Sequence, residues 1–400
     1  MNIVAESRNL RVKETYDTVV CGGGVAGIAA ALASARHGAK TLLIEREYLL
    51  GGLATAGLVT IYLPLCDGKG RQVSFGIAEE LLRLSMAHGA EARYPKAWLE
   101  GGSVEEKCAH RYEVQFNPQL FALDAEALLL KEGVDVLYGT LVSDVIKAGD
   151  RITALAAENK SGRYAIGVTK NVVDCTGDAD VAYRAGEGCE VFGQGNVLAA
   201  WHYYNGKNGY GLRMLGAADV PDKDKKDGKA PETLIERRFT GLDGRELSEM
   251  VQLSHAQLLA DIEKKQAADE SYMPVTMPTI PQIRMTRRIA GVYVQDDGEI
   301  RKDYADAVGC FGDWRKRGPA YALPYRCLHG EKVENLLAAG RCISVTDAMW
   351  DITRVIPVCA VSGQAAGTAA AMFDGARSAD AAKLREALVT DGVKITLSDK

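Results

Sequence analysis

A glycine-rich turn near the N-terminus limits the possible folds more than any other feature of the sequence. The turn, Gly22–Gly27, reads GGGVAG and separates an apolar segment, Tyr16–Cys21, from a run of small residues, Val25–His37. The first segment is typical of a buried strand, the second of a helix, and Lys40–Glu45 of another buried strand. A strand, turn, helix and strand within about 30 residues predict a parallel crossover.

The turn matches the G-x-G-x-x-G pattern of dinucleotide-binding proteins. Gly22 permits a tight turn, Gly24 leaves room for a diphosphate, and Gly27 lets the helix pack closely on the strand. The N-terminus of the following helix favours phosphate through its N–H groups and its dipole. Glu45 follows Gly27 by 18 positions, where a carboxylate accepts hydrogen bonds from ribose hydroxyls. The sequence therefore predicts a dinucleotide site.

Two further glycine clusters favour FAD over NAD. Gly51–Thr55 follows the acidic residue and lets backbone amides approach a long cofactor, and Gly340–Gly367 closes the chain with a second small-residue helix. The N-terminus of that helix would stabilise the negative charge of reduced flavin. A second nicotinamide fold is not expected, because Gly186–Gly188 lacks the strand and helix context. The substrate or a diffusing partner must then supply or accept the electrons.

The sequence resembles the FAD-dependent oxidoreductase family of the glutathione-reductase-like superfamily, in the branch with a single dinucleotide fold. Residues 16–47, 51–59, 172–186, 283–293 and 334–372 carry the resemblance. One departure is Asp347, where relatives commonly have histidine, so a proton-transfer role of that histidine does not carry over. The cofactor site that the motifs and the resemblance imply consists of Gly22, Gly24, Val25, Ala26, Gly27, Glu45, Arg46, Gly51, Gly52, Leu53, Ala54, Thr55, Val142, Thr176, Gly177, Asp178, Gly340, Arg341, Val355 and Gly363.

The length of 400 residues exceeds that of one typical hydrophobic core, so we expect an α/β protein built in two parts. The first part is a discontinuous, Rossmann-like FAD-binding domain at 1–75, 115–186 and 330–400. The second is an inserted mixed α+β substrate or cap region at 76–114 and 187–329.

Four further elements are predicted within these parts. Phe116–Glu132 favours a helix capped by Asn117, and 151–168 favours a hairpin. Glu246–Ala267 favours an amphipathic helix, and Gly291–Gln295 a strand, while Asp222–Lys229 is typical of an exposed charged loop.

The candidates for catalysis are His202, Arg284, Arg287 and Arg354. His202 lies in an aromatic strand and is either a base for a hydroxyl proton or a structural histidine. Arg284 and Arg287, with Arg288, either clamp a substrate carboxylate or tie the insert to the core by ion pairs. Arg354 precedes the last small-residue helix and could face phosphate, flavin or substrate.

Charge and composition exclude several function classes. The formal net charge of -5 argues against binding to nucleic acid through phosphates, and no apolar run approaches the roughly 20 residues needed to span a membrane. The first residues lack the apolar region of a secretory signal. Nine scattered cysteines form no C-x-x-C pair, so no metal site is predicted and a cytoplasmic protein is expected. The sequence leaves the formation of a homo-oligomer open.

We expect an FAD-dependent dehydrogenase or oxidase that takes a hydride from a C–H bearing a hydroxyl or amine in a small polar substrate. The electron acceptor is external and not specified by the sequence. Two alternatives remain open at this point. One is a fumarate-reductase-like flavin reductase of an activated C=C bond, in which arginines clamp a carboxylate. The other is a flavoprotein in RNA modification or a non-catalytic nucleotide-binding protein.

Overall fold

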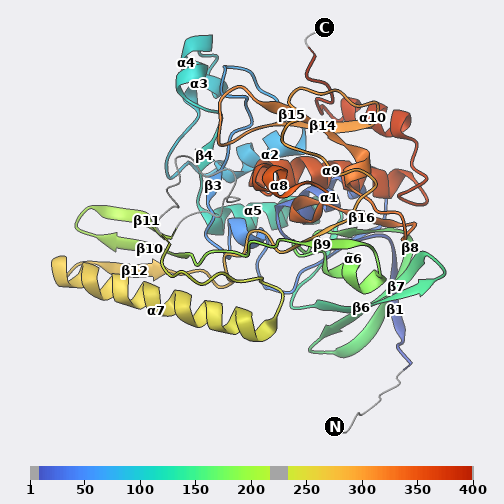
Figure 1. Cartoon of the computed structure of the whole chain (residues 1–400), viewed down its shortest axis with the longest axis horizontal. Coiled ribbons are helices and arrows are strands. Elements are labelled where there is room, and N and C mark those ends of the chain that lie inside the picture. Colours follow the sequence, from blue (N-terminus) through green and yellow to red (C-terminus); the bar gives the residue numbers. More distant parts are fainter. Residues whose placement is uncertain (1–8, 217–232, 399–400) are drawn as a thin grey trace.

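A computed structural model describes residues 9–216 and 233–398 (Figure 1). The predicted charged loop Asp222–Lys229 and the first eight residues lie outside the described residues. The chain forms a central sheet with helices, and a helix with three strands that extends to one side (Figure 1).

The predicted parallel crossover at the N-terminus is confirmed. Strand β1 (Val12–Cys21), helix α1 (Val25–Arg36) and strand β2 (Thr41–Ile44) follow one another, and β1 and β2 pair in parallel from Thr18 opposite Thr41 to Cys21 opposite Ile44. All four residues of β2 are buried, as expected of a strand covered on both faces.

The main sheet has seven strands, in the order β5-β2-β1-β8-β7-β6, with β16 also pairing with β8. The strands next to the crossover run parallel, while β6, β7 and β8 form an antiparallel meander that includes the predicted hairpin. The remaining strands of this sheet are β5 (Asp135–Leu137), β6 (Leu141–Ala148), β7 (Arg151–Asn159), β8 (Gly162–Asp174) and β16 (Leu336–Ala338).

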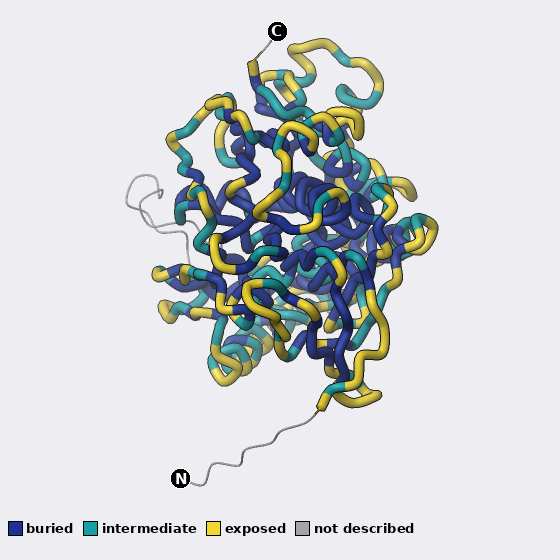
Figure 2. Tube along the Cα trace, turned by 90° about the vertical axis from the view of Figure 1, so that its right-hand side faces the viewer, coloured by how far each residue is buried: buried dark blue, intermediate teal, exposed yellow. Residues whose placement is uncertain are grey.

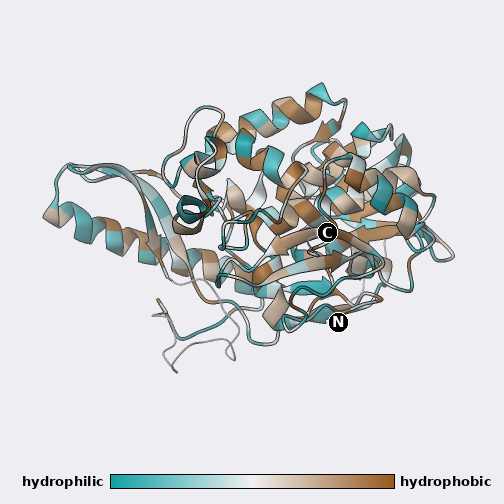
Figure 3. Ribbon diagram, turned by 90° about the horizontal axis from the view of Figure 1, so that it is seen from above, coloured by the Kyte–Doolittle hydropathy of each residue, from teal (hydrophilic) through white to brown (hydrophobic). Residues whose placement is uncertain are grey.

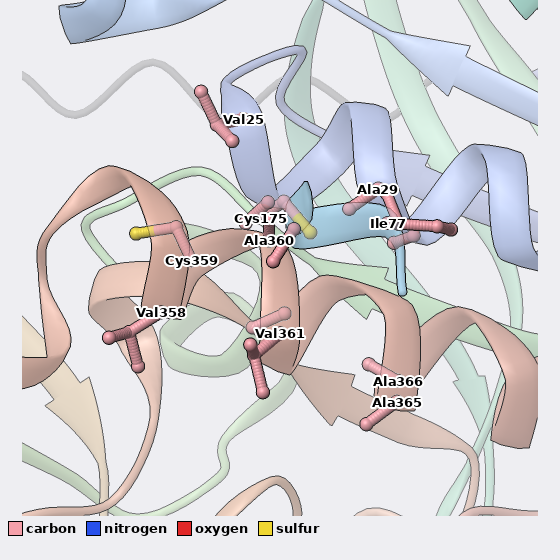
Figure 4. Close-up of a cluster of buried hydrophobic side chains, with 14 of the residues drawn as sticks. Val25, Ala29, Ile77, Cys175, Val358, Cys359, Ala360, Val361, Ala365 and Ala366 are labelled. Carbon is pink, nitrogen blue, oxygen red and sulfur yellow. The ribbon is translucent and has the colours of Figure 1, made fainter. Parts of the chain in front are cut away.

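Helices α1 and α9 (Ile356–Met372) form the centre of the core. Every residue of α9 from Ile356 to Ala371 is buried, and its many small side chains let the two helices pack closely. Figure 2 shows this buried interior in dark blue, and Figure 4 shows side chains of the cluster, among them Ala29, Ala365 and Ala366. Other helices of the body are α2 (Ile77–Ser85), α5 (Pro118–Lys131), α6 (Asp180–Ala185), α8 (Asp347–Thr353) and α10 (Ala381–Thr390).

The predicted helix near residue 120 is confirmed as α5. Asn117 caps it, since its side-chain oxygen accepts hydrogen bonds from the N–H groups of Gln119 and Leu120, and Pro118 occupies the first turn.

An arm extends from the body (Figure 3). It consists of the long helix α7 (Gly244–Ala268), which was predicted, and a small antiparallel sheet of order β11-β10-β12. The side-chain carboxylate of Asp243 caps α7. The strands are β10 (Ala200–Gly206), β11 (Gly209–Leu215) and β12 (Met273–Thr276).

Short strands and helices complete the part of the chain that the structure describes. They are β3 (Ile61–Tyr62), β4 (Val114–Gln115), β9 (Cys189–Val191), β13 (Arg287–Ile289), β14 (Ala307–Gly312), β15 (Ala320–Pro324), α3 (Lys96–Leu99), α4 (Val104–Ala109) and the 3₁₀ turns η1 (Gly52–Ala54), η4 (Tyr325–Cys327) and η5 (Gly340–Cys342).

The strand predicted at Gly291–Gln295 is wrong. The strand in this region is β13, which pairs antiparallel with β9, almost 100 residues earlier in the chain. Residues 291–295 form no strand, and Gln295 makes one isolated bridge to Val345. The division into a cofactor domain and an insert stays a prediction. Helix α2, which that division assigns to the insert, packs in the same core cluster as α9.

Within the described residues, no single helix is long and apolar enough to cross a membrane. The pair α8 and α9 has the required length and composition together, but it bends by 92° between the two helices. Most of its residues are buried in the core, which accounts for its apolar character.

Candidate functional site

The glycine turn after β1 has the geometry that its sequence predicts. Gly22 has a φ of 103°, in the region that favours glycine, and its N–H donates to the carbonyl of Ile44 over 2.8 Å. A Cβ on Gly27 would lie 1.8 Å from the carbonyl oxygen of Gly22. Gly27 therefore serves the close packing of α1 on the turn.

The N-terminus of α1 is open toward a cavity. The first helical hydrogen bond runs from Ile28 N–H to Gly24 O over 2.9 Å, and no side chain caps the helix. A Cβ on Gly24 would meet no atom within 4 Å. The N–H groups of Val25 and Ala26 precede that first bond, so the helix offers donors and positive potential to an anion such as a diphosphate.

Glu45 lies at the carboxyl end of β2, beside the glycine turn. One of its carboxylate oxygens accepts from Gly23 N–H over 2.6 Å and the other from Glu47 N–H over 2.8 Å. Burial raises the pKa of Glu45, and these two backbone hydrogen bonds oppose the rise. Each carboxylate oxygen keeps a lone pair, so Glu45 can still accept from ribose hydroxyls.

A second loop folds back onto the glycine turn. Gly51 N–H donates to Gly23 O over 2.8 Å, and Gly51 forms an isolated bridge with Gly24. Thr55 is buried, and its hydroxyl donates a hydrogen bond to the carbonyl of Leu50. This bond stabilises the loop. The turn at 51–54 therefore forms one wall of the cavity.

Helix α9 points its N-terminus at the same cavity. Its first helical bond runs from Cys359 N–H to Val355 O over 2.9 Å, and no side chain caps it. Gly340 lies between the two helices, since a Cβ there would be 2.8 Å from Ala26 Cβ and 3.6 Å from Cys359 Sγ. Burial raises the pKa of Cys359 to about 12, so its thiol is neutral. Two uncapped helix N-termini thus meet at one cavity.

The segment after β8 forms the third wall. Asp174 is fully buried and accepts from the hydroxyl of Thr176 over 2.7 Å and from Ala182 N–H over 2.9 Å. Burial raises the pKa of Asp174, and these hydrogen bonds oppose the rise. Asp178 accepts from Arg341 over 3.2 Å and from the Thr286 hydroxyl over 2.7 Å, which joins this wall to the residue that precedes β13.

The cavity brings together most of the predicted cofactor residues. Of the predicted set, Gly27, Thr55, Val355 and Gly363 do not line it. Gly363 packs against α1, because a Cβ there would lie 2.3 Å from the carbonyl oxygen of Ala26. The predicted residues that line the cavity are Gly22, Gly24, Val25, Ala26, Glu45, Arg46, Gly51, Gly52, Leu53, Ala54, Val142, Thr176, Gly177, Asp178, Gly340, Arg341 and Arg354.

His202 lies outside this cavity. Its side chain is fully buried in the arm, and Nε2 is 2.8 Å from the hydroxyl of Tyr272. Burial lowers the pKa of His202, so the ring is neutral near pH 7. The position of His202 outside the cavity gives no support to a role as a base. It agrees with the alternative of a structural histidine.

The arginines at 284–288 also lie outside the cavity. Arg287 donates to the carbonyl of Asp178 over 2.9 Å and to the carboxylate of Asp180 over 2.7 Å. Arg284 is buried and stacks on Trp201, with its guanidinium carbon 5.4 Å from the ring centroid. Arg287 thus ties β13 to the segment after β8, an arrangement of the kind that the ion-pair alternative expects.

Arg288 is likewise paired, with Asp347 and Glu190, each over 2.8 Å. This pairing gives Asp347, which stands where relatives commonly have histidine, a structural partner.

Sequence reasoning missed the insert side of the cavity. The residues there are small or apolar, and the only sequence signal of a turn near them is the spacing of Pro274, Pro278 and Pro281. The lining residues on this side are Gly241, Leu247, Ile280, Pro281 and Ile283. Among the described residues, no three His, Cys, Asp or Glu side chains group so that they could hold a metal ion.

The donors and spaces of the cavity fit a dinucleotide. Glu45 can accept from ribose hydroxyls, two uncapped helix N-termini can face anionic groups, and Gly24 leaves an open approach for a diphosphate. The fold and the cavity therefore define a dinucleotide-binding protein of the Rossmann class.

The chain belongs to the FAD dependent oxidoreductase family, whose model matches residues 17–200 and 208–388. It is accordingly an oxidoreductase, and its cofactor is FAD. The residues that line the cavity and would be available to hold the cofactor include 22, 24, 45, 51–54, 176–178 and 340–341.

The chain is also similar to a thioredoxin reductase of Ureaplasma parvum serovar 3, at 31% identity over 75 residues, or 19% of this chain. The match spans only 24% of the length of that reductase. Among solved structures, a geranylgeranyl bacteriochlorophyll reductase-like protein of Thermoplasma acidophilum aligns with 94% of this chain and 80% of its own, at 15% identity and a TM-score of 0.43. The anhydrotetracycline hydroxylase OxyS of Streptomyces rimosus aligns with 94% of this chain and 65% of its own, at 15% identity and a TM-score of 0.45.

Proposed function

We propose that this FAD-dependent oxidoreductase takes a hydride from a carbon that bears an amine or a hydroxyl group in a small polar substrate. Bound FAD supplies the hydride acceptor, and the chain supplies position and polarity. In this proposal, no group of arginines binds a carboxylate of the substrate.

The charge balance of the cavity is the observation that carries the proposal. Three arginines line the cavity, and each lies beside a carboxylate: Arg46 is 3.6 Å from Glu47, Arg341 is 3.2 Å from Asp178, and Arg354 is bonded to Asp351. An enoate or a dicarboxylate would need cationic charge that these acids already offset. This balance favours a neutral polar substrate over the substrate of a fumarate-reductase-like enzyme.

The insert wall supports the same choice. Leu247, Ile280, Pro281 and Ile283 face the cavity with apolar or backbone groups. Such a wall excludes water and packs against the carbon skeleton of a small molecule, while a few polar groups fix its orientation.

The groups that could take a proton favour an amine over an alcohol. No histidine, tyrosine or lysine is among the described residues that line the cavity. Of the carboxylates there, Glu47, Asp178 and Asp180 are each ion-paired with an arginine, and Glu45 accepts hydrogen bonds from two backbone N–H groups. Burial holds the pKa of the thiols of Cys175 and Cys359 above the usual value, so neither is an anion at neutral pH. A neutral amine can lose a hydride without a protein base, because its own lone pair stabilises the cation that forms, whereas an alcohol needs a base for its proton.

Anaerobic mixing of the FAD-loaded protein with three groups of compounds tests the proposal. Small amines are expected to bleach the flavin, with a rate that rises with pH as the amine loses its proton. Polyols are expected to react more slowly, and enoates are expected not to re-oxidise the reduced protein. Re-oxidation by an enoate without bleaching by any amine or alcohol would contradict the proposal. Bleaching by no small molecule would favour a non-catalytic or RNA-directed role.

A pair of variants on one helix tests the role of the insert wall. Leu247→Arg places a cation in the cavity and is expected to lower the apparent affinity for a neutral amine by about tenfold at equal FAD occupancy. The control is Leu259→Arg on the same helix, where the side chain is 58% exposed and lies outside the cavity. Equal effects of the two substitutions would argue against a substrate contact at the insert wall.

A further inference from the structure

Four charged side chains of alternating sign form a chain from the turn between β14 and β15 to the cavity. Arg315 Nε donates to Asp313 Oδ1 over 3.2 Å, and Arg315 Nη1 to Asp351 Oδ2 over 3.4 Å. Arg354 Nε donates to Asp351 Oδ1 over 3.1 Å. Asp351 is fully buried, and of the four only Arg354 lines the cavity. The guanidinium of Arg354 is therefore paired with a carboxylate that does not itself line the cavity.

The fold fixes this chain firmly. Arg354 follows the last residue of α8, two positions before α9 begins, so its backbone belongs to the bend between these helices. Trp314 Nε1 donates to the carbonyl of Asp351 over 2.9 Å, and Arg111 donates to the carbonyl of Trp314. The turn at 313–315 thus holds Asp351 through both its side chain and its backbone.

The order of groups in the cavity indicates which part of FAD lies near Arg354. Glu45 marks the ribose of the adenosine, and the N-terminus of α1 marks the diphosphate. Gly340 lies between Ala26 of that helix and Cys359 at the start of α9, next along the cavity lining. With FAD bound in that order, its redox-active end would lie toward α9 and Arg354, which line the same cavity.

We propose that Asp351 is a positioning residue that fixes Arg354 beside the redox-active end of FAD and, together with Arg315, sets the electron affinity of the cofactor. Reduction of FAD takes up two electrons and one proton, and the cofactor becomes more negative by one charge. A nearby positive charge favours that change and a nearby negative charge opposes it. The formal charges of the two acids and the two arginines sum to zero. Removal of an acid is therefore expected to favour reduction of FAD, and removal of an arginine to oppose it.

The test measures the midpoint potential of the bound FAD against a redox dye of known potential, with dithionite as the electron donor. Asp351→Asn removes a negative charge and is expected to shift the reduction equilibrium toward reduced flavin. Arg315→Gln removes a positive charge and is expected to shift it the other way. A unit charge within about 10 Å, at an effective dielectric of about 20, changes an equilibrium constant roughly tenfold. For a two-electron couple that change is about 30 mV.

A charge-conserving double variant and a control variant outside the cavity complete the test. The double variant Asp351→Asn with Arg315→Gln conserves the net charge and is expected to return the potential close to that of the parent protein, and it also serves if Asp351→Asn alone does not fold. Asp261→Asn is the control, because Asp261 pairs with Arg213 over 2.7 Å in the arm, outside the cavity. The proposal is overturned if Asp351→Asn and Arg315→Gln shift the potential in the same direction, or no more than Asp261→Asn does. It does not depend on the substrate, so failure of the amine titration would leave it standing.

Discussion

Gly363 of α9 lies against Ala26 of α1 so closely that a Cβ on Gly363 would be 2.3 Å from the carbonyl oxygen of Ala26. The same relation recurs one turn later, where a Cβ on Gly367 would be 2.0 Å from the carbonyl oxygen of Ala30. The glycines of the last helix thus serve helix packing, and this packing aims the N-termini of α1 and α9 at one cavity.

Substitution of Gly363 is therefore expected to affect stability first. Gly363→Val forces the two helices apart and should lower the free energy of unfolding of the FAD-free protein by about 3 kcal/mol, the upper end for overpacking of a core. Chemical denaturation of the FAD-free protein measures this loss. An unchanged midpoint with weakened FAD binding would instead make Gly363 a cofactor contact.

Substitution of Gly24 is expected to affect FAD binding more than stability. A Cβ there meets no protein atom within 4 Å, so Gly24→Ala should cost the FAD-free protein no more than about 1 kcal/mol, as a weaker helix cap. The methyl group projects where the diphosphate approaches, and FAD affinity should fall at least about tenfold. Isothermal titration with FAD, paired with denaturation, separates the two effects. A variant that binds FAD as the parent does would place the diphosphate elsewhere.

The contrast between these two glycines shows what the sequence can and cannot predict. The first crossover and the capped helix at Asn117 were predictable, because buried strands, glycine turns and caps leave local patterns. The pairing of β13 with β9 and the partners of Arg287 were not, since they join residues about 100 positions apart. The packing of Gly363 on α1 was not predictable either, because a glycine that admits a cofactor and one that admits a helix look alike in sequence.

FAD binding is expected to depend on pH through Glu45. Burial raises the pKa of this carboxyl above its ordinary value of 4.5. Protonation removes an acceptor for ribose hydroxyls, so FAD affinity should fall as pH is lowered through the raised pKa. The Glu45→Gln variant should bind more weakly at pH 8 and show no such fall. Quenching of FAD fluorescence between pH 5 and pH 8 measures both, and equal pH profiles for parent and variant would contradict this role.

The FAD-free protein should show the opposite trend with pH at this residue. A raised carboxyl pKa means that the folded state holds the proton more tightly than the unfolded state. The contribution of Glu45 to stability is then greatest at or below pH 4.5 and is reduced as pH rises through the folded pKa. Comparison of the parent with Glu45→Gln by denaturation at several pH values checks this sign.

His202 is expected to matter for stability and not for hydride transfer. His202→Phe loses the hydrogen bond to Tyr272 and should cost about 1–2 kcal/mol of unfolding free energy. The rate of flavin reduction by an amine at equal FAD occupancy should change less than about threefold. General bases contribute roughly a hundredfold or more. A loss of that size in stopped-flow experiments would show that His202 acts in the reaction.

The stoichiometry of FAD binding tests the central claim most directly. The FAD-free protein should bind one FAD per chain in a titration followed by calorimetry, and Gly24→Glu, which places a carboxylate at the N-terminus of α1, should abolish this binding while the protein remains folded. Saturable binding that Gly24→Glu leaves intact, or no binding of FAD to the folded parent protein, would contradict the assignment of this cavity as the cofactor site.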